Sequence, residues 1–169
     1  KEMNLNYLDK GNFKNSIILS KKKDKEYTLS GPSFNANKLI DILLKTDSKT
    51  KSKLINKNFL IKTQIDAVLI DKKNYIKNFS GSLTYKDHQV SNTNLRGILT
   101  DNKKFNFTIN STKTSKVTTL FIENAEPIIN RYKFIKGFEE GILDFYSINE
   151  NNETRSILKI YDFKLKELP

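Results

Sequence analysis

Residues with the chemistry for catalysis are scarce in this chain of 169 residues. Cysteine is absent and histidine occurs once, as His88. Thiol catalysis, disulfide frameworks and zinc sites built on cysteine and histidine are therefore excluded, and a Ser–His relay could use only His88. Because His88 lies in a polar stretch between two alternating segments, we interpret it as part of a solvated hairpin tip.

Sequence motifs that bind phosphates, dinucleotides or catalytic zinc do not occur, and neither does the nucleophile motif of serine hydrolases. The adjacent carboxylates Glu139 and Glu140 stand at the start of an expected strand, and Asp66 falls on the polar side of another. Solvation at the surface accounts for all three residues. We therefore predict a protein that is not an enzyme and that uses neither a metal nor a cofactor.

The formal net charge of +11 would ordinarily indicate nucleic acid or an anionic membrane as partner. Lysine outnumbers arginine by 27 to 3, however, whereas specific nucleic-acid contacts favour the bidentate arginine side chain. The charge is also uneven, with +8 over residues 1–63, +5 over 64–116 and −2 over 117–169. We interpret the three lysines at 21–23 as a solvated loop. Charge alone therefore names no partner.

The elements that must position any site are predicted by an alternation of apolar and polar residues. The separation is complete in segment 104–110, and segments 59–69 and 75–85 alternate in a similar way. Such segments are typical of antiparallel strands with one apolar and one solvated face. The candidate residues of the apolar lining are Phe59, Ile61, Ile65, Leu69, Phe79, Leu83, Phe105, Phe107 and Ile109.

About nine strands are expected in all, connected by short polar turns such as 86–88 and 101–103. Several are longer than an average strand, which favours a mainly β fold with a long, antiparallel, twisted and curled sheet. The other strand candidates are 13–19, 25–30, 89–100, 116–123, 140–148 and 154–165.

Two segments have helical rather than alternating spacing, and both predict short amphipathic helices. Segment 35–44 can be capped by Asn35, and segment 124–132 can be capped by Asn124, with Pro127 in its first turn. The polar segment 47–57 is expected to be a loop. Two helices of about 10 residues cover about 15 Å each, so part of the apolar sheet face should stay open as a trough.

The length fits a single domain spanning residues 1–169. No apolar run reaches the roughly 20 residues that cross a bilayer, and no signal peptide is recognisable. Because Lys1 already lies in an alternating segment, we expect the chain to be part of a longer protein.

Three stretches resemble the AsmA-like superfamily, in particular its large repeat-containing proteins of the YhdP type. Segment 31–36 is similar to the family's turn before a short helix, with Asn35 in the usual acidic position. Segments 124–132 and 135–143 are similar to its helix and following glycine-rich strand start. Segment 156–165, closing at Pro169, resembles the terminal strand, with Ser156 where glycine is usual.

The resemblance implies a β-groove module of a bridge-like lipid transfer protein. Its groove would shield phospholipid acyl chains between the inner and outer membranes, in a periplasmic part of a protein anchored in the inner membrane. A continuous apolar lining would serve this role without any catalytic residue, because it removes a cost of about 0.8 kcal/mol per CH₂ exposed to water.

Two alternatives stay open at this point. A nucleic-acid-binding β-domain would carry its aromatic residues on the polar strand faces, where they could stack on bases. A structural or adhesin-like β-domain would instead close the same apolar face into an ordinary core.

Overall fold

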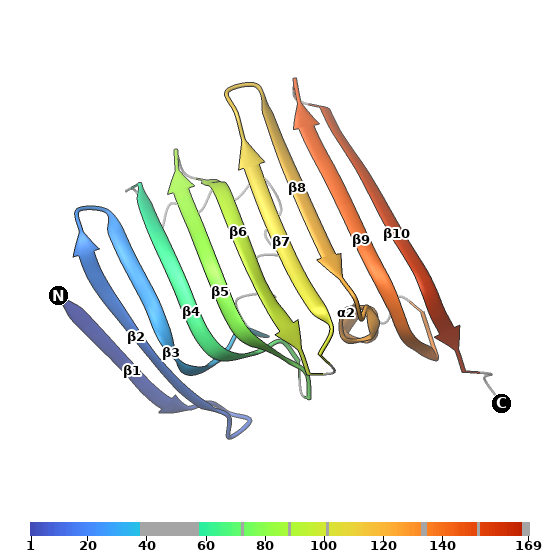
Figure 1. Ribbon diagram of the computed structural model, residues 1–169, viewed down its shortest axis with the longest axis horizontal. Coiled ribbons are helices and arrows are strands. Elements are labelled where there is room, and N and C mark those ends of the chain that lie inside the picture. Colours follow the sequence, from blue (N-terminus) through green and yellow to red (C-terminus); the bar gives the residue numbers. More distant parts are fainter. Residues whose placement is uncertain are drawn as a thin grey trace.

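The computed structural model describes residues 1–37, 58–71, 73–87, 89–100, 102–132, 135–151 and 153–166. These residues form one ten-stranded sheet and one short helix, α2 (Glu126–Tyr132) (Figure 1). The mainly β fold is thereby confirmed. The strands are β1 (Glu2–Leu8), β2 (Lys14–Lys23), β3 (Glu26–Asn35), β4 (Phe59–Leu69), β5 (Tyr75–Lys86), β6 (Gln89–Leu99), β7 (Lys104–Ser111), β8 (Ser115–Ile122), β9 (Phe138–Glu150) and β10 (Glu153–Leu165).

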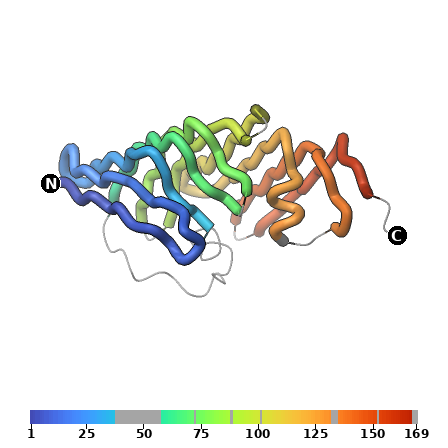
Figure 2. The backbone as a smooth tube through the Cα atoms, turned by 90° about the horizontal axis from the view of Figure 1, so that it is seen from below, coloured from blue at the N-terminus to red at the C-terminus, as the bar shows by residue number. Residues whose placement is uncertain are grey.

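The strands lie in the sheet in chain order, so each pairs with its neighbours in sequence. Every pair is antiparallel except β3 and β4, which run parallel. The predicted antiparallel sheet of about nine strands is close to the observed one: the sheet is mixed because of this one parallel pair, and β1 adds a tenth strand. The sheet does not close, because β1 and β10 lie at its two edges. Figure 2 shows the two termini at opposite ends of the molecule.

The helix predicted over 124–132 is confirmed as α2. The side-chain oxygen of Asn124 accepts a hydrogen bond from the backbone N–H of Glu126 at 3.0 Å, which is the expected N-cap. Pro127 lies in the first turn, where its missing N–H costs little. Most of the other predicted helix, 35–44, and the whole predicted loop 47–57 lie outside the described residues.

Five residues with positive φ lie in the turns between strands, and four of them are Asn or Asp, which tolerate this conformation. Asp87 (φ 51°) follows β5 and Asn102 (φ 64°) precedes β7, so the turns predicted at 86–88 and 101–103 are confirmed by their described residues. His88 and Asp101 lie outside the described residues.

A β-bulge at Asn78 changes which residues of β4 and β5 face the apolar side. Asn78 has φ of 50°, and the pairing of β5 with β6 shifts by one residue between Lys77 and Ser80. Beyond this point the buried residues Val68 and Ile76 pair with each other, and Ile76 pairs with buried Leu99. The apolar side of β4 therefore passes from odd to even positions after Ile65.

The buried core lies at the ends of the strands near α2 (Figure 1). Isoleucine is the commonest residue type among the core residues from the sheet. The helix α2 contributes Ile129, and Ala125, directly before the helix, is also part of the core. The core residues are Ile17, Ala36, Ile65, Val68, Ile70, Ile76, Leu99, Ile122, Ala125, Ile129, Phe138 and Leu143.

Candidate functional site

One row of side chains crosses the apolar face of the sheet from edge to edge. Each member is the direct pairing partner of the next member on the neighbouring strand, so all ten lie on the same face. Eight of the ten are large and apolar, and only Thr63 and Gly81 interrupt them. We call this the central row, and it consists of Met3, Leu19, Leu29, Thr63, Gly81, Leu95, Phe107, Leu120, Phe145 and Leu158.

The central row is long and accessible. Ten strands at about 4.8 Å spacing place its ends roughly 43 Å apart. None of its ten members is buried, and the two terminal members are half exposed, with 49% exposure for Met3 and 53% for Leu158. The row therefore forms a continuous apolar surface that runs across the strands rather than along one of them.

A second row lies on the same face, two residues further along each strand, and it is more deeply buried. Ile122 pairs with Phe105 and with Leu143, directly beside the central-row residues of the same strands. Ile65, Ile122 and Leu143 in this second row are only 1%, 2% and 3% exposed. We call it the covered row, and it consists of Ile65, Phe79, Phe105, Ile122, Leu143 and Ile160.

The helix α2, the only helix among the described residues, covers part of this row. Its start is fixed to β9, because the N–H of Ala125 donates to the carbonyl oxygen of Gly141 at 2.7 Å. At its other end the Arg131 guanidinium donates to the backbone oxygens of Ile70 and Asn37. These contacts hold the helix across the strand ends of the sheet and away from the central row.

Eight of the nine predicted lining residues lie on this apolar face, but they divide between the two rows and their surroundings. Phe107 belongs to the central row, and Ile61, Leu83 and Ile109 lie in the adjacent row on the side away from the covered row, where Ile109 is buried. Ile65, Phe79 and Phe105 belong to the covered row. Phe59 stacks on Tyr85 near the far strand ends, with 5.1 Å between ring centroids. Leu69 lies on the opposite face, because the bulge at Asn78 reverses the alternation of β4.

Most of the central row was missed by sequence reasoning. Leu95, Leu120, Phe145 and Leu158 all lie in segments that were predicted as strands, so their alternation was available as a signal. The signal does not reveal which residues of different strands pair, and that pairing is what aligns these side chains into a row.

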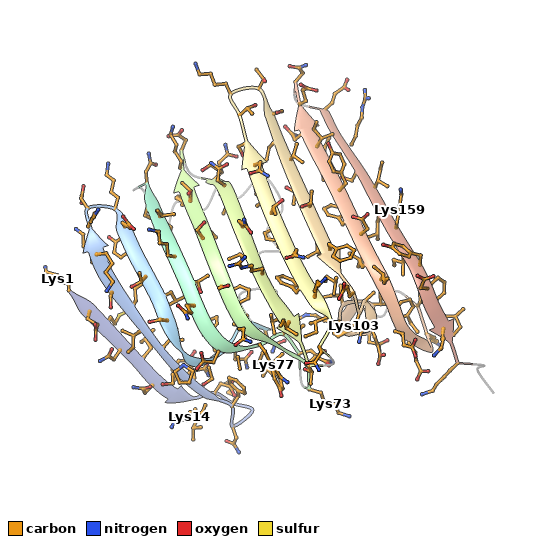
Figure 3. The ribbon with its side chains drawn as sticks, in the orientation of Figure 1. Lys1, Lys14, Lys73, Lys77, Lys103 and Lys159 are labelled. Carbon is orange, nitrogen blue, oxygen red and sulfur yellow. The ribbon has the colours of Figure 1, made fainter. Side chains whose placement is uncertain are left out.

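The opposite face of the sheet carries basic side chains on several strands. Lys62, Arg96 and Lys104 lie on it in β4, β6 and β7, among Asn, Ser and Thr side chains. Its exposed aromatic residues Tyr146 and Tyr161 lie on β9 and β10, where Arg155 and Lys159 of β10 share the same face. The lysines labelled in Figure 3 are spread from one edge of the sheet to the other and form no single patch.

The residues considered for catalysis are engaged at the surface. Glu140 pairs with Lys164 at 2.5 Å and Glu139 pairs with Lys166, while Asp66 is exposed. The Glu140 carboxylate raises the pKa of Lys164, chiefly through their hydrogen bond. Within the described ranges no three acidic, histidine or cysteine side chains are placed to hold a metal ion.

A hollow among the described residues lies beside the turn between β6 and β7 and has a volume of about 690 Å³. Its lining is mostly charged or polar, with Lys103, Glu123, Glu140 and Asp162 among its residues. It is therefore unrelated to the central row and unsuited to an apolar ligand.

One charged residue borders the apolar face. Lys116 pairs with Ser111 and Asn149 at the strand ends remote from α2, and burial lowers the pKa of its ammonium group. The apolar face thus ends, on this side, in a rim of polar groups.

Comparisons with protein-family models, with curated proteins and with solved structures found no match to this chain. Across the part of the chain that the structure describes, no helix is both long and apolar enough to cross a membrane.

Proposed function

We propose that this chain is a non-enzymatic lipid-binding module in which the apolar sheet face shields acyl chains from water. The observation that supports the proposal is the central row: apolar residues aligned across ten strands, none of them buried. A surface of this kind offers an acyl chain a dry path and needs no reactive group.

The dimensions and energies are compatible with this role. The row spans roughly 43 Å, whereas one leaflet of a bilayer core, filled by acyl chains, is about 15 Å thick. Each CH₂ group removed from water stabilises the bound state by about 0.8 kcal/mol, so even half-shielded chains gain several kcal/mol.

The finer proposal follows the resemblance to AsmA-like proteins. The sheet would be the twisted and curled wall of a β-groove, in a periplasmic part of a longer chain anchored in the inner membrane. Phospholipid would then pass along the groove between the inner and outer membranes. The open sheet and the accessible apolar row support this proposal.

Lipid that copurifies with the protein tests the proposal directly. Protein purified from bacterial membranes should carry phospholipid that mass spectrometry detects after organic extraction. The variant Phe107→Asp should lose most of this lipid, because a carboxylate beside the acyl chain is unfavourable, yet it should unfold only about 1–2 kcal/mol more easily, since position 107 is not fully buried.

Asn106→Asp is the matched control, because it adds the same charge on the opposite face of the same strand. It should keep the lipid content of the unchanged protein. Folded protein that is repeatedly free of lipid would argue against the proposal. A collapse of thermal stability in Phe107→Asp would show instead that the face is a closed core, as in a structural β-domain.

A further inference from the structure

The strand pair β8–β9 carries three directly paired couples of side chains that change in polarity along the apolar face. The first couple belongs to the central row and is apolar, the second couple carries hydroxyl groups, and the third carries an ammonium group and an amide. None of the six residues is buried. We call this the polarity ladder, and it consists of Leu120 with Phe145, Thr118 with Ser147, and Lys116 with Asn149.

The hydroxyl groups of the polarity ladder have protons to donate. The Ser147 hydroxyl accepts a hydrogen bond from the Ser156 hydroxyl at 2.8 Å, so its own proton stays available. Thr118 makes no side-chain hydrogen bond within the part of the chain that the structure describes. Both hydroxyl groups can therefore donate to oxygen atoms of a ligand that lies on this face.

Buried hydroxyl groups without a partner gather on the same face. Four buried side-chain oxygens of the described residues have no hydrogen-bond partner, and all four lie on the apolar face of β4–β7. Ser111 is the direct pairing partner of Lys116, and Thr93 is only 4% exposed. Such groups are few in native proteins and each needs an explanation, which a polar ligand at this place supplies. They belong to Thr63, Tyr85, Thr93 and Ser111.

Lys116 faces no negative charge. Among the described residues it makes neither an ion pair nor a hydrogen bond, and burial lowers the pKa of its ammonium group with no carboxylate to raise it again. Glu150 and Glu153, at the same end of β9 and β10, pair with each other on the opposite face. A partly buried ammonium group without a counterion favours an anionic ligand.

The order and spacing of the polarity ladder match those of a glycerophospholipid. Such a lipid presents a phosphate, then ester groups, then hydrocarbon, whereas a fatty acid has no ester level. Lys116 lies about 13 Å along β8 from Leu120, and its flexible side chain can lean toward that residue. The polar layer of one membrane leaflet is about 5–8 Å deep, which is of the same order.

We propose that the polarity ladder binds the phosphate end of a glycerophospholipid whose acyl chains lie on the central row. Lys116 pairs with the phosphate, while Thr118 and Ser147 donate hydrogen bonds to the ester carbonyl oxygens. The headgroup then lies at the strand ends remote from α2. This inference rests on the proposed lipid-binding function and adds to it the class of lipid and the position of its headgroup.

Short-chain lipids separate the contribution of the headgroup from that of the chains. After copurified lipid has been removed, calorimetry should show that dioctanoyl phosphatidylglycerol binds about tenfold more tightly than dioctanoylglycerol, which has the same chains and esters but no phosphate. Equal affinities would overturn the headgroup site and leave lipid binding intact, whereas no binding of either lipid would overturn the proposed function as well. Glycerol 3-phosphate, which has no chains, should bind at least tenfold more weakly than the phospholipid. Equally tight binding would indicate a site for free phosphate instead.

Substitutions assign the phosphate to one residue. Lys116→Gln should lose the tenfold preference for the phospholipid and keep its affinity for dioctanoylglycerol. Lys113→Gln is the matched control, because it removes the same charge from the exposed turn between β7 and β8 and should keep the preference. A preference that survives in Lys116→Gln, or that is lost equally in Lys113→Gln, would overturn the assignment.

A second substitution tests the ester contacts. Thr118→Val replaces a hydroxyl group by a methyl group of similar shape, so its melting temperature should stay unchanged while its affinity for both dioctanoyl lipids falls about threefold. Unchanged affinity for both lipids would show that Thr118 does not contact the esters.

Discussion

The covered row and the central row are neighbours on one sheet face, yet three of the six residues in the covered row are buried and none in the central row is. Ile122 and Leu120 are two residues apart on β8, on the same face, but Ile122 is buried and Leu120 is only partly so. The backbone pairing is equally regular at both positions. At this position the neighbourhood of α2, rather than the backbone pairing, accompanies the difference in burial.

This difference teaches that the same sequence pattern can build two kinds of surface. In the covered row, burial removes apolar area from water and stabilises the fold by about 25 cal/mol per Å². In the central row, much of that area stays accessible and is available to a ligand. Substitutions should therefore affect stability strongly in the first row and ligand content in the second.

The largest effect is expected where α2 meets the covered row. Ile129 is 1% exposed, so Ile129→Asp places an unpaired carboxylate in the core and should destabilise the protein by about 4 kcal/mol or more. Phe107→Asp is its counterpart in the central row and should cost far less. Urea unfolding of both variants measures the difference, and equal losses would remove the distinction between the rows.

A glycine in the central row provides the next largest effect. Gly81 has φ of 146°, and a Cβ atom there would lie 1.8 Å from the backbone oxygen of Asn94. Gly81→Ala should therefore destabilise the protein by about 2 kcal/mol, although the position is accessible. Gly11→Ala is the control, because the nearest atom to its Cβ is 3.4 Å away. Similar melting temperatures for both variants would show that the open row tolerates backbone movement.

Loosening the cover without touching the sheet should have a smaller effect. Asn124→Ala removes the N-cap of α2 and should cost about 1 kcal/mol. Asn130→Ala, at an exposed position of the same helix, should be nearly neutral. Both variants should keep their bound lipid, since the central row is unchanged. Lipid loss confined to Asn124→Ala would mean that α2 contributes to the lipid-binding surface.

The smallest effect concerns an ion pair on the polar face, away from both rows. Lys62 donates to Glu26 at 2.7 Å, and this hydrogen bond lowers the pKa of the Glu26 carboxyl below its ordinary value of 4.5. A lowered pKa means that the carboxylate stabilises the fold above pH 4.5, and that this contribution is lost as the pH falls through the folded-state pKa. Lys62→Gln should return the pKa of Glu26 toward 4.5, which carboxyl NMR titration detects. An unchanged titration would show that the pair does not persist in solution.

The sequence predicted individual elements better than their assembly. Strict alternation around Phe107 identified both the strand and its apolar face, and helical spacing with an Asn cap identified α2. Leu69 was assigned to the wrong face, because a single residue in the left-handed region, Asn78, reverses the alternation of two strands. Nothing in the local pattern of β4 signals a reversal at a bulge that lies on the neighbouring strand β5.

Assembly depends on pairing, which local patterns do not encode. The predicted strand at 25–30 continues to Asn35 as β3. Pro32 has no N–H to donate, and it is tolerated because the pairing of β3 with β2 shifts register opposite it, so that no residue of β2 pairs with it. The parallel pairing of β3 with β4 depends on the path of the chain between them. The central row became visible only when nine strand pairings were known together.

The chain-order topology has a consequence for the speed of folding. Since every strand pairs with the next strand in the chain, most contacts form between residues that are close in sequence, which favours rapid folding. The parallel joint is the exception, because 23 residues separate Asn35 from Phe59 and the loop between them must close before the strands can pair. We therefore expect β1–β3 and β4–β10 to form as two folding units, each by successive addition of strands. The pairing of β3 with β4 should be the slow step that joins them.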